Sequence, residues 1–119
     1  MSYNDQIRDV IQGSDVALFM KGTPSFVMCG NSDRALQALR RAGAPVTAVD
    51  ILPDPQIRQE LSSISGWPTI PQVFVKGELL GGADIVEELE QSGELATTLR
   101  ERLGDDYEAS RSETTVAIG

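Results

Sequence analysis

The chain has 119 residues and contains no histidine, a single cysteine and only two lysines. The absence of histidine excludes acid–base catalysis by an imidazole and metal sites built from histidine ligands. A lone cysteine cannot form a disulfide within the chain, so any redox cycle takes its second thiol from a small molecule or another protein. The unpaired cysteine is typical of a cytoplasmic protein.

Positive charge is also scarce. Ten Lys and Arg residues stand against 18 Asp and Glu residues, which gives a formal net charge of −8. Nucleic-acid binding takes most of its affinity from cations that neutralise phosphates, so we expect no nucleic-acid partner. An acidic, lysine-poor surface also favours the hypothesis that the protein is adapted to concentrated salt.

Long apolar runs are missing as well. No run approaches the length of about 18 residues that a membrane span needs, and residues 1–9 lack the basic and then apolar order of an export signal. A chain of this length suits one compact domain with a core of its own. We therefore expect no membrane partner and a cytoplasmic location.

The apolar pattern predicts alternating helices and strands. It predicts helices over residues 3–12, 33–41 and 54–65 and a broken pair from 84 to 103, and strands over residues 16–20, 46–51, 72–75 and 78–80. A parallel crossover followed by a hairpin gives an α/β fold with a four-stranded mixed sheet between helices. The predicted domain covers residues 1–103, and the polar, acidic residues 104–119 predict a disordered tail.

Cys29 lies in a loop, residues 21–32, that leads from the first predicted strand into the second predicted helix. Backbone N–H groups at a helix start favour the thiolate, which is the form that attacks sulfur or binds metal. Lys21 closes the strand eight residues earlier, where its ammonium would lower the thiol pKa further. A small buried cysteine and a solvated lysine explain the same pattern equally well.

Ile70 and Pro71 form a stiff connection directly before a strand-like run. A cis peptide bond there would turn the Ile70 backbone outward, free to pair with an extended ligand. Spacing alone favours a plain rigid turn, because few such bonds are cis.

Two glycines precede Ala83 and Asp84 at the start of a predicted helix. Glycine lets a ligand approach the backbone, and the free N–H groups of a helix start attract a carboxylate. Asp84 is a candidate N-cap of this helix and a candidate acceptor for a ligand amine, and the two roles are not exclusive. Arg58 has the fork geometry that suits a carboxylate, and it is otherwise a surface arginine.

Five blocks of sequence taken together are more specific than any of these residues alone. They are Lys-Gly-Thr-Pro at 21–24, Cys-Gly-Asn-Ser at 29–32, Asp-Pro-Gln-Ile-Arg at 54–58, Trp-Pro-Thr-Ile-Pro-Gln-Val-Phe-Val-Lys-Gly-Glu at 67–78 and Gly-Gly-Ala-Asp-Ile at 81–85. Over residues 5–103 the chain resembles the monothiol glutaredoxins, whose loop reads Cys-Gly-Phe-Ser. It departs from them at Asn31 in place of the phenylalanine, at Val27 in place of a proline and at Ala83 in place of cysteine or serine.

This resemblance implies a thioredoxin-like three-layer sandwich, a site for glutathione or another low-molecular-weight thiol, and a [2Fe–2S] cluster bridging two protomers. Cys29 would be the metal ligand and the catalytic thiol, with Lys21 beside the sulfurs. The implied contacts of the small thiol are Arg58 with its glycine carboxylate, Ile70 with its backbone, and Ala83 and Asp84 with its γ-glutamyl end. The implied partners are a second copy of the chain, apo iron–sulfur proteins and a BolA-like protein that would supply a histidine.

Three functions follow, in decreasing order of preference. The first is a carrier or scaffold of the cluster, and the second is a glutathione-dependent oxidoreductase in which the Cys29 thiolate attacks a mixed disulfide. Because Ser32 cannot resolve the resulting intermediate, a free thiol must. The third is a redox-inert interaction module with Cys29 merely buried.

Overall fold

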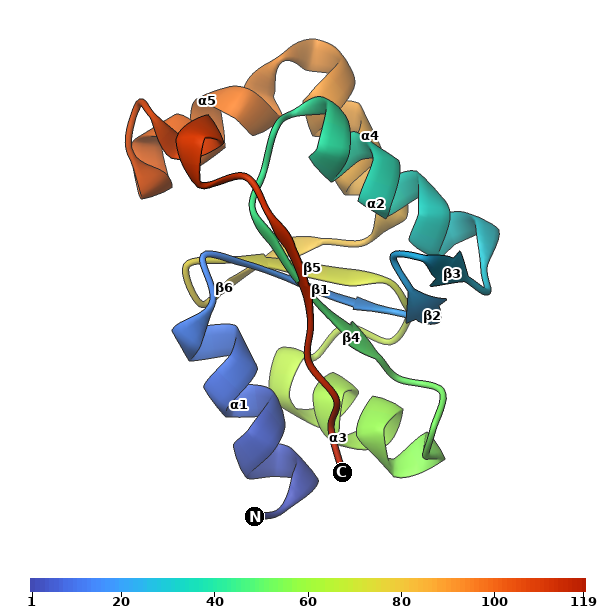
Figure 1. Ribbon diagram of the computed structural model, residues 1–119. Coiled ribbons are helices and arrows are strands. Elements are labelled where there is room, and N and C mark those ends of the chain that lie inside the picture. Colours follow the sequence, from blue (N-terminus) through green and yellow to red (C-terminus); the bar gives the residue numbers. More distant parts are fainter.

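Figure 1 shows the chain as a computed structural model that describes residues 1–119, with a central sheet between two groups of helices. The helices are α1 (Tyr3–Gly13), α2 (Gly30–Arg41), α3 (Pro55–Ser65), α4 (Ala83–Ser92), α5 (Glu94–Leu103) and the short 3₁₀ helix η1 (Tyr107–Ser110). The strands are β1 (Val16–Met20), β2 (Gly22–Thr23), β3 (Phe26–Val27), β4 (Val46–Asp50), β5 (Gln72–Val75), β6 (Glu78–Gly81) and β7 (Glu113–Thr115). Each predicted helix and strand is present.

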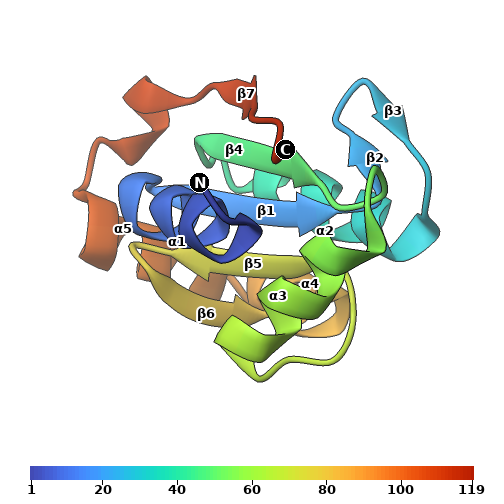
Figure 2. The same ribbon diagram turned by 90° about the horizontal axis from the view of Figure 1, so that it is seen from below.

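The main sheet has the strand order β6-β5-β1-β4-β7, which Figure 2 shows from below. β1 is parallel to β4 and antiparallel to β5, and β5 and β6 form the predicted hairpin. Its turn contains Lys76 and Gly77, both with positive φ. The mixed α/β sheet is therefore confirmed.

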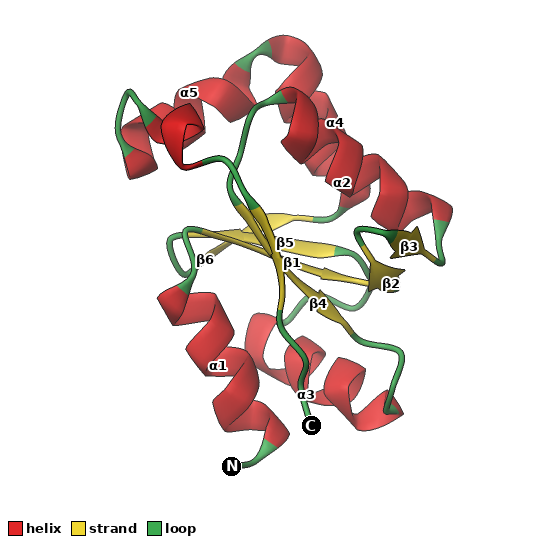
Figure 3. Cartoon of the chain, in the orientation of Figure 1, coloured by secondary structure: helices red, strands yellow, loops and turns green.

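Helices cover both faces of this sheet, with α2, α4 and α5 on one side and α1 and α3 on the other (Figure 3). β1 supplies both cores, because successive side chains of a strand point to opposite faces. Leu18 and Met20 belong to the core under α2 and α4, whereas Ala17 and Phe19 belong to the core under α1 and α3. Burial on both faces explains why β1 reads as a continuous apolar run. None of the helices combines the length and apolar character that a membrane crossing requires.

The tail of residues 104–119 is ordered, so the prediction of disorder was wrong. β7 pairs in parallel with β4, with Glu113 opposite Val46, and the sheet has five strands rather than the four predicted. The Tyr107 hydroxyl donates to the Ala42 carbonyl at 2.6 Å, and Ile118 is buried in the core under α1 and α3. Tyr107 and Ile118, the two buried residues of the tail, are buried by contact with segments that are distant in the sequence.

Candidate functional site

The cysteine loop, residues 21–32, folds back on the end of β1 through the small β2–β3 hairpin. The Met28 N–H donates to the Lys21 carbonyl at 2.9 Å, and the Lys21 N–H donates to the Ser32 hydroxyl at 3.0 Å. Asp50 at the end of β4 accepts from the Gly22 N–H at 2.9 Å. The loop is thereby closed at both ends, and Cys29 lies beside the carboxyl end of β1, where open α/β folds place their ligands.

Cys29 is the N-cap residue of α2, with an extended backbone and a partly exposed side chain. Its thiol pKa is lowered from its ordinary value, first by the Ser32 backbone N–H and then by the Asn31 backbone N–H. The Ser32 hydroxyl and the charge of Lys21 lower it further, while partial burial opposes these effects. The helix start therefore favours the thiolate, as the sequence predicted, and the contribution of Lys21 is the smallest of the four.

A cavity of about 240 Å³ lies beside the start of α2. It is lined by Asn31, Trp67, Thr69, Ile70, Pro71, Gly82, Ala83, Asp84 and Ile85. Three of the predicted ligand-binding residues, Ile70, Ala83 and Asp84, are thus brought together. The Ile70–Pro71 peptide bond is cis, whereas sequence spacing alone favoured a plain turn.

Two of the cavity walls carry hydrogen-bond donors. Gly82 is the N-cap of α4 and offers no side-chain cap, so the first N–H groups of this helix have no partner within it. The indole Nε1 of Trp67 is buried without a partner, and a Cβ added to Gly82 would lie 3.2 Å from it. A carboxylate in this cavity would satisfy the N–H groups at the start of α4, whereas the indole Nε1 is too deeply buried for a ligand to reach. In the sequence, Trp67 stood out only as the first residue of the block 67–78.

Gln72 fixes the connection of residues 67–71 that forms one of these walls. Its side chain is fully buried, and its Nε2 donates to the carbonyls of Trp67 at 2.9 Å and Thr69 at 3.1 Å. Two bonds from one amide thus hold the first and the middle residue of this short segment. The sequence marked Gln72 only as the first residue of a strand.

Asp84 is the second residue of α4 and not its N-cap, because Gly82 takes that position. Its carboxylate instead accepts from the Nη2 of Arg34 on α2 at 2.9 Å. The same guanidinium bonds Glu87 at 2.7 and 3.3 Å and the Asn31 side-chain oxygen at 3.2 Å. Arg34 was not singled out from the sequence, since its acidic partners lie about fifty residues away.

Lys21 and Arg58 line a different cavity, of about 370 Å³, together with Ile51, Leu52, Pro55 and Gln59. The Arg58 guanidinium makes one long bond, of 3.4 Å, to the Pro68 carbonyl. Cys29 lines neither cavity. Asn31, two residues after Cys29, lines the first cavity. Met28, the residue before Cys29, donates its backbone N–H to the carbonyl of Lys21, which lines the second cavity.

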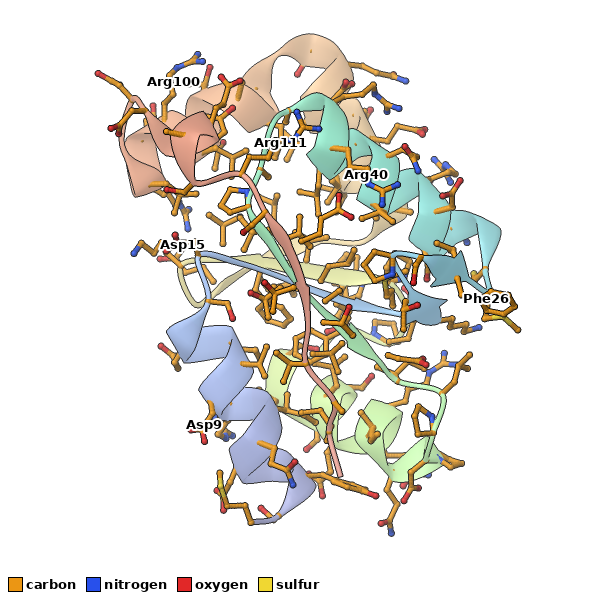
Figure 4. The ribbon with its side chains drawn as sticks, in the orientation of Figure 1. Asp9, Asp15, Phe26, Arg40, Arg100 and Arg111 are labelled. Carbon is orange, nitrogen blue, oxygen red and sulfur yellow. The ribbon has the colours of Figure 1, made fainter.

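Large apolar side chains are exposed close to Cys29 in the sequence and in the loop that follows β4. Phe26 is 71 % exposed, Met28 56 % and Leu52 46 %. Figure 4 shows Phe26 projecting from the β2–β3 hairpin at the side of the molecule. The chain itself holds no group of three or more His, Cys, Asp or Glu residues that could bind a metal ion.

The arrangement of a mixed sheet, a thiol at the start of α2 and a cis-proline connection defines a thiol protein of the thioredoxin-like class. The solution structure of reduced poplar apo GrxS14 is similar to this chain, with a TM-score of 0.76 and 38 % identity, over 86 % of this chain and 94 % of that one. Residues 16–80 match the family model for glutaredoxin. The chain belongs to the glutaredoxin family.

Its relatives include monothiol members of that family. It is 52 % identical over 84 residues to the probable monothiol glutaredoxin GrlA of Legionella pneumophila, covering 71 % of this chain and 94 % of the relative. It is 50 % identical over 100 residues to monothiol glutaredoxin-S11 of rice, covering 84 % of this chain but only 20 % of that longer protein. The chain thus spans about a fifth of the rice relative. The resemblance inferred from the five sequence blocks is confirmed.

Proposed function

We propose that the protein is a carrier of a [2Fe–2S] cluster that bridges two copies of the chain, with glutathione or a similar thiol as co-ligand. The observation that carries this proposal is Cys29, a partly exposed thiol of lowered pKa in a chain without a second cysteine. Such clusters are held by four thiolates. One chain offers one, so two chains and two small thiols complete the set.

The cavities beside Cys29 fit a small thiol that carries a carboxylate and an ammonium group. The N–H groups at the start of α4 are donors for a carboxylate, and the Asp84 carboxylate, which stays largely exposed beside Arg34, is an acceptor for an ammonium group. The cis bond after Ile70 supports pairing with the ligand backbone. Arg58 and Lys21, in the other cavity, add positive charge for a second carboxylate and for the thiolate sulfurs.

The proposed partners are a second copy of the chain, apo iron–sulfur proteins that receive the cluster, and a BolA-like protein that contributes a histidine. The exposed apolar side chains of Phe26, Met28 and Leu52 support contacts of this kind, because such groups lose water when a partner covers them. The single unpaired cysteine supports a cytoplasmic location.

The partly exposed thiolate of Cys29 also supports a second function, the reduction of mixed disulfides between glutathione and proteins. The Cys29 sulfur would attack the glutathione sulfur, release the protein thiolate and form a Cys29–glutathione disulfide. Free glutathione thiolate would then attack that disulfide, giving oxidised glutathione and the Cys29 thiolate. Ser32 has no thiol to resolve the intermediate, so each turnover consumes one free glutathione, and the other half of the oxidised glutathione comes from the substrate.

Anaerobic reconstitution with iron, sulfide and glutathione tests the first function. We expect visible charge-transfer absorption, bound iron and a mass of two chains, all lost in Cys29→Ser. Ser63→Ala, an exposed change on α3, is the control and keeps all three. Colourless, iron-free monomers with every small thiol tried would refute the carrier. Turnover of a glutathionylated peptide by those monomers would establish the second function in its place.

A further inference from the structure

Arg34 forms an ion pair with Asp84, the one carboxylate that lines the first cavity. Its Nη2 lies 2.9 Å from the Asp84 Oδ1 and 2.7 Å from the Glu87 Oε1, while its Nε bonds the other Glu87 oxygen at 3.3 Å. Its Nη1 bonds the Asn31 side chain at 3.2 Å. The guanidinium is therefore fixed on Glu87 by two nitrogens, and it reaches two residues of the cavity lining with the remaining hydrogen-bonding capacity.

We infer that Arg34 is a specificity-determining residue of the small-thiol site, which disfavours ligands that place a free ammonium group at Asp84 and favours ligands that place only a carboxylate there. The inference rests on the proposed thiol site and states which chemical class of thiol that site prefers. It concerns the charge that the ligand presents to α4, at the end remote from its sulfur.

The charges of Arg34 and Asp84 determine which kind of ligand the site prefers. An ammonium group that approaches Asp84 meets a carboxylate already paired with a cation, and it is repelled by that cation at short range. A ligand carboxylate at the start of α4 is attracted both by the free N–H groups and by the guanidinium beside them. Because the Asp84 side chain is 89 % exposed and that of Arg34 39 %, water and salt screen the effect, which limits it to a few-fold in affinity.

A purely structural role, that of joining α2 to α4, is the competing explanation. The chain offers a matched control for it, since Arg41 joins the same two helices through a 2.7 Å bond to Glu90 but, unlike Arg34, bonds no residue that lines the cavity. If Arg34 only held the helices together, loss of either arginine would lower the affinity for both kinds of ligand by the same factor. Discrimination between ligands separates the two explanations.

The experiment measures the affinity of S-methylglutathione and of its N-acetyl derivative, which lacks the ammonium charge. The full-length protein is titrated without iron, and the fluorescence of Trp67, the only tryptophan, reports binding because this side chain lines the cavity. In Arg34→Gln we expect the ratio of the two affinities to shift about two- to fivefold towards S-methylglutathione, and this shift to shrink in 1 M KCl. In Arg41→Gln we expect an unchanged ratio.

A ratio that is the same in the wild-type protein and in Arg34→Gln overturns the inference, as does an equal shift in Arg41→Gln. Both results leave the thiol site of the proposed function standing, since the ligands still bind. Failure of the wild-type protein to bind either ligand overturns the inference together with the proposed thiol co-ligand. Circular dichroism of each variant shows that it is folded before its ratio is compared.

Discussion

Removal of a single oxygen atom from the C-terminal tail tests whether the tail belongs to the folded domain. Tyr107 is 3 % exposed, and its hydroxyl donates to the carbonyl of Ala42, the C-cap residue of α2. Tyr107→Phe keeps the ring and removes that bond. A hydrogen bond of this kind contributes about 1 kcal/mol to stability, so we expect the free energy of unfolding to fall by about that amount.

A loss of this size corresponds to roughly a fivefold change in the unfolding equilibrium and lowers Tm by about 4 °C in a domain of this length. Tyr107→Ala also removes the ring from the core under α2 and α4. Loss of a buried aromatic ring costs about 3–5 kcal/mol where the surroundings cannot collapse. Here the loss cannot exceed the free energy with which the tail docks, because beyond that point the tail detaches and the rest of the domain stays folded.

Urea unfolding followed by far-ultraviolet circular dichroism measures both variants. Asp105→Asn is the control, because this exposed tail residue makes no side-chain hydrogen bond or ion pair, and we expect it to stay within about 0.5 kcal/mol of the wild type. If Tyr107→Phe and Tyr107→Ala both stayed within that range, the tail would contribute no stability and the ordered tail described above would be refuted.

Two further predictions concern the thiol and the acidic surface. The hydrogen bond of the Ser32 hydroxyl lowers the Cys29 pKa more than the charge of Lys21 does. We therefore expect the pH profile of alkylation by iodoacetamide to move to higher pH in Ser32→Ala, and by less in Lys21→Gln. A larger shift in Lys21→Gln would contradict this ranking. Because salt screens the repulsion within a chain of net charge −8, the urea midpoint should rise between 0.1 and about 2 M KCl, and a flat or falling midpoint would argue against salt adaptation.

The main elements of the fold were predictable from local patterns. A continuous apolar run predicted β1, and the Asp54–Pro55 start and the Gly66 stop predicted α3. Each of these signals depends only on residues that are close together in the sequence. β7 has no such signal. Its residues are exposed and polar, and only the register with β4, nearly seventy residues earlier, makes them a strand. Local propensity carries no information on a pairing of that separation.

The candidate site was predictable where one short block carries the chemistry. Cys29 at a helix start and Ala83 at the start of α4 lie where the sequence placed them. The division between the cavity of Ile70 and that of Arg58 was not predicted, because it depends on how α3 and the connection of residues 67–71 lie relative to the cysteine loop. The position of Arg34 likewise depends on the packing of α2 against α4.

The strand β7 also changes how copies of this protein can meet. Without it, β4 would present a row of unpaired N–H and C=O groups along its outer side, a surface onto which another extended chain readily adds. With it, the sheet ends on that side in three exposed polar residues, Glu113, Thr114 and Thr115, too short a strand to recruit a neighbour. Edge-to-edge association is blocked there, which leaves encounters between two copies to other faces, among them the one that carries Cys29.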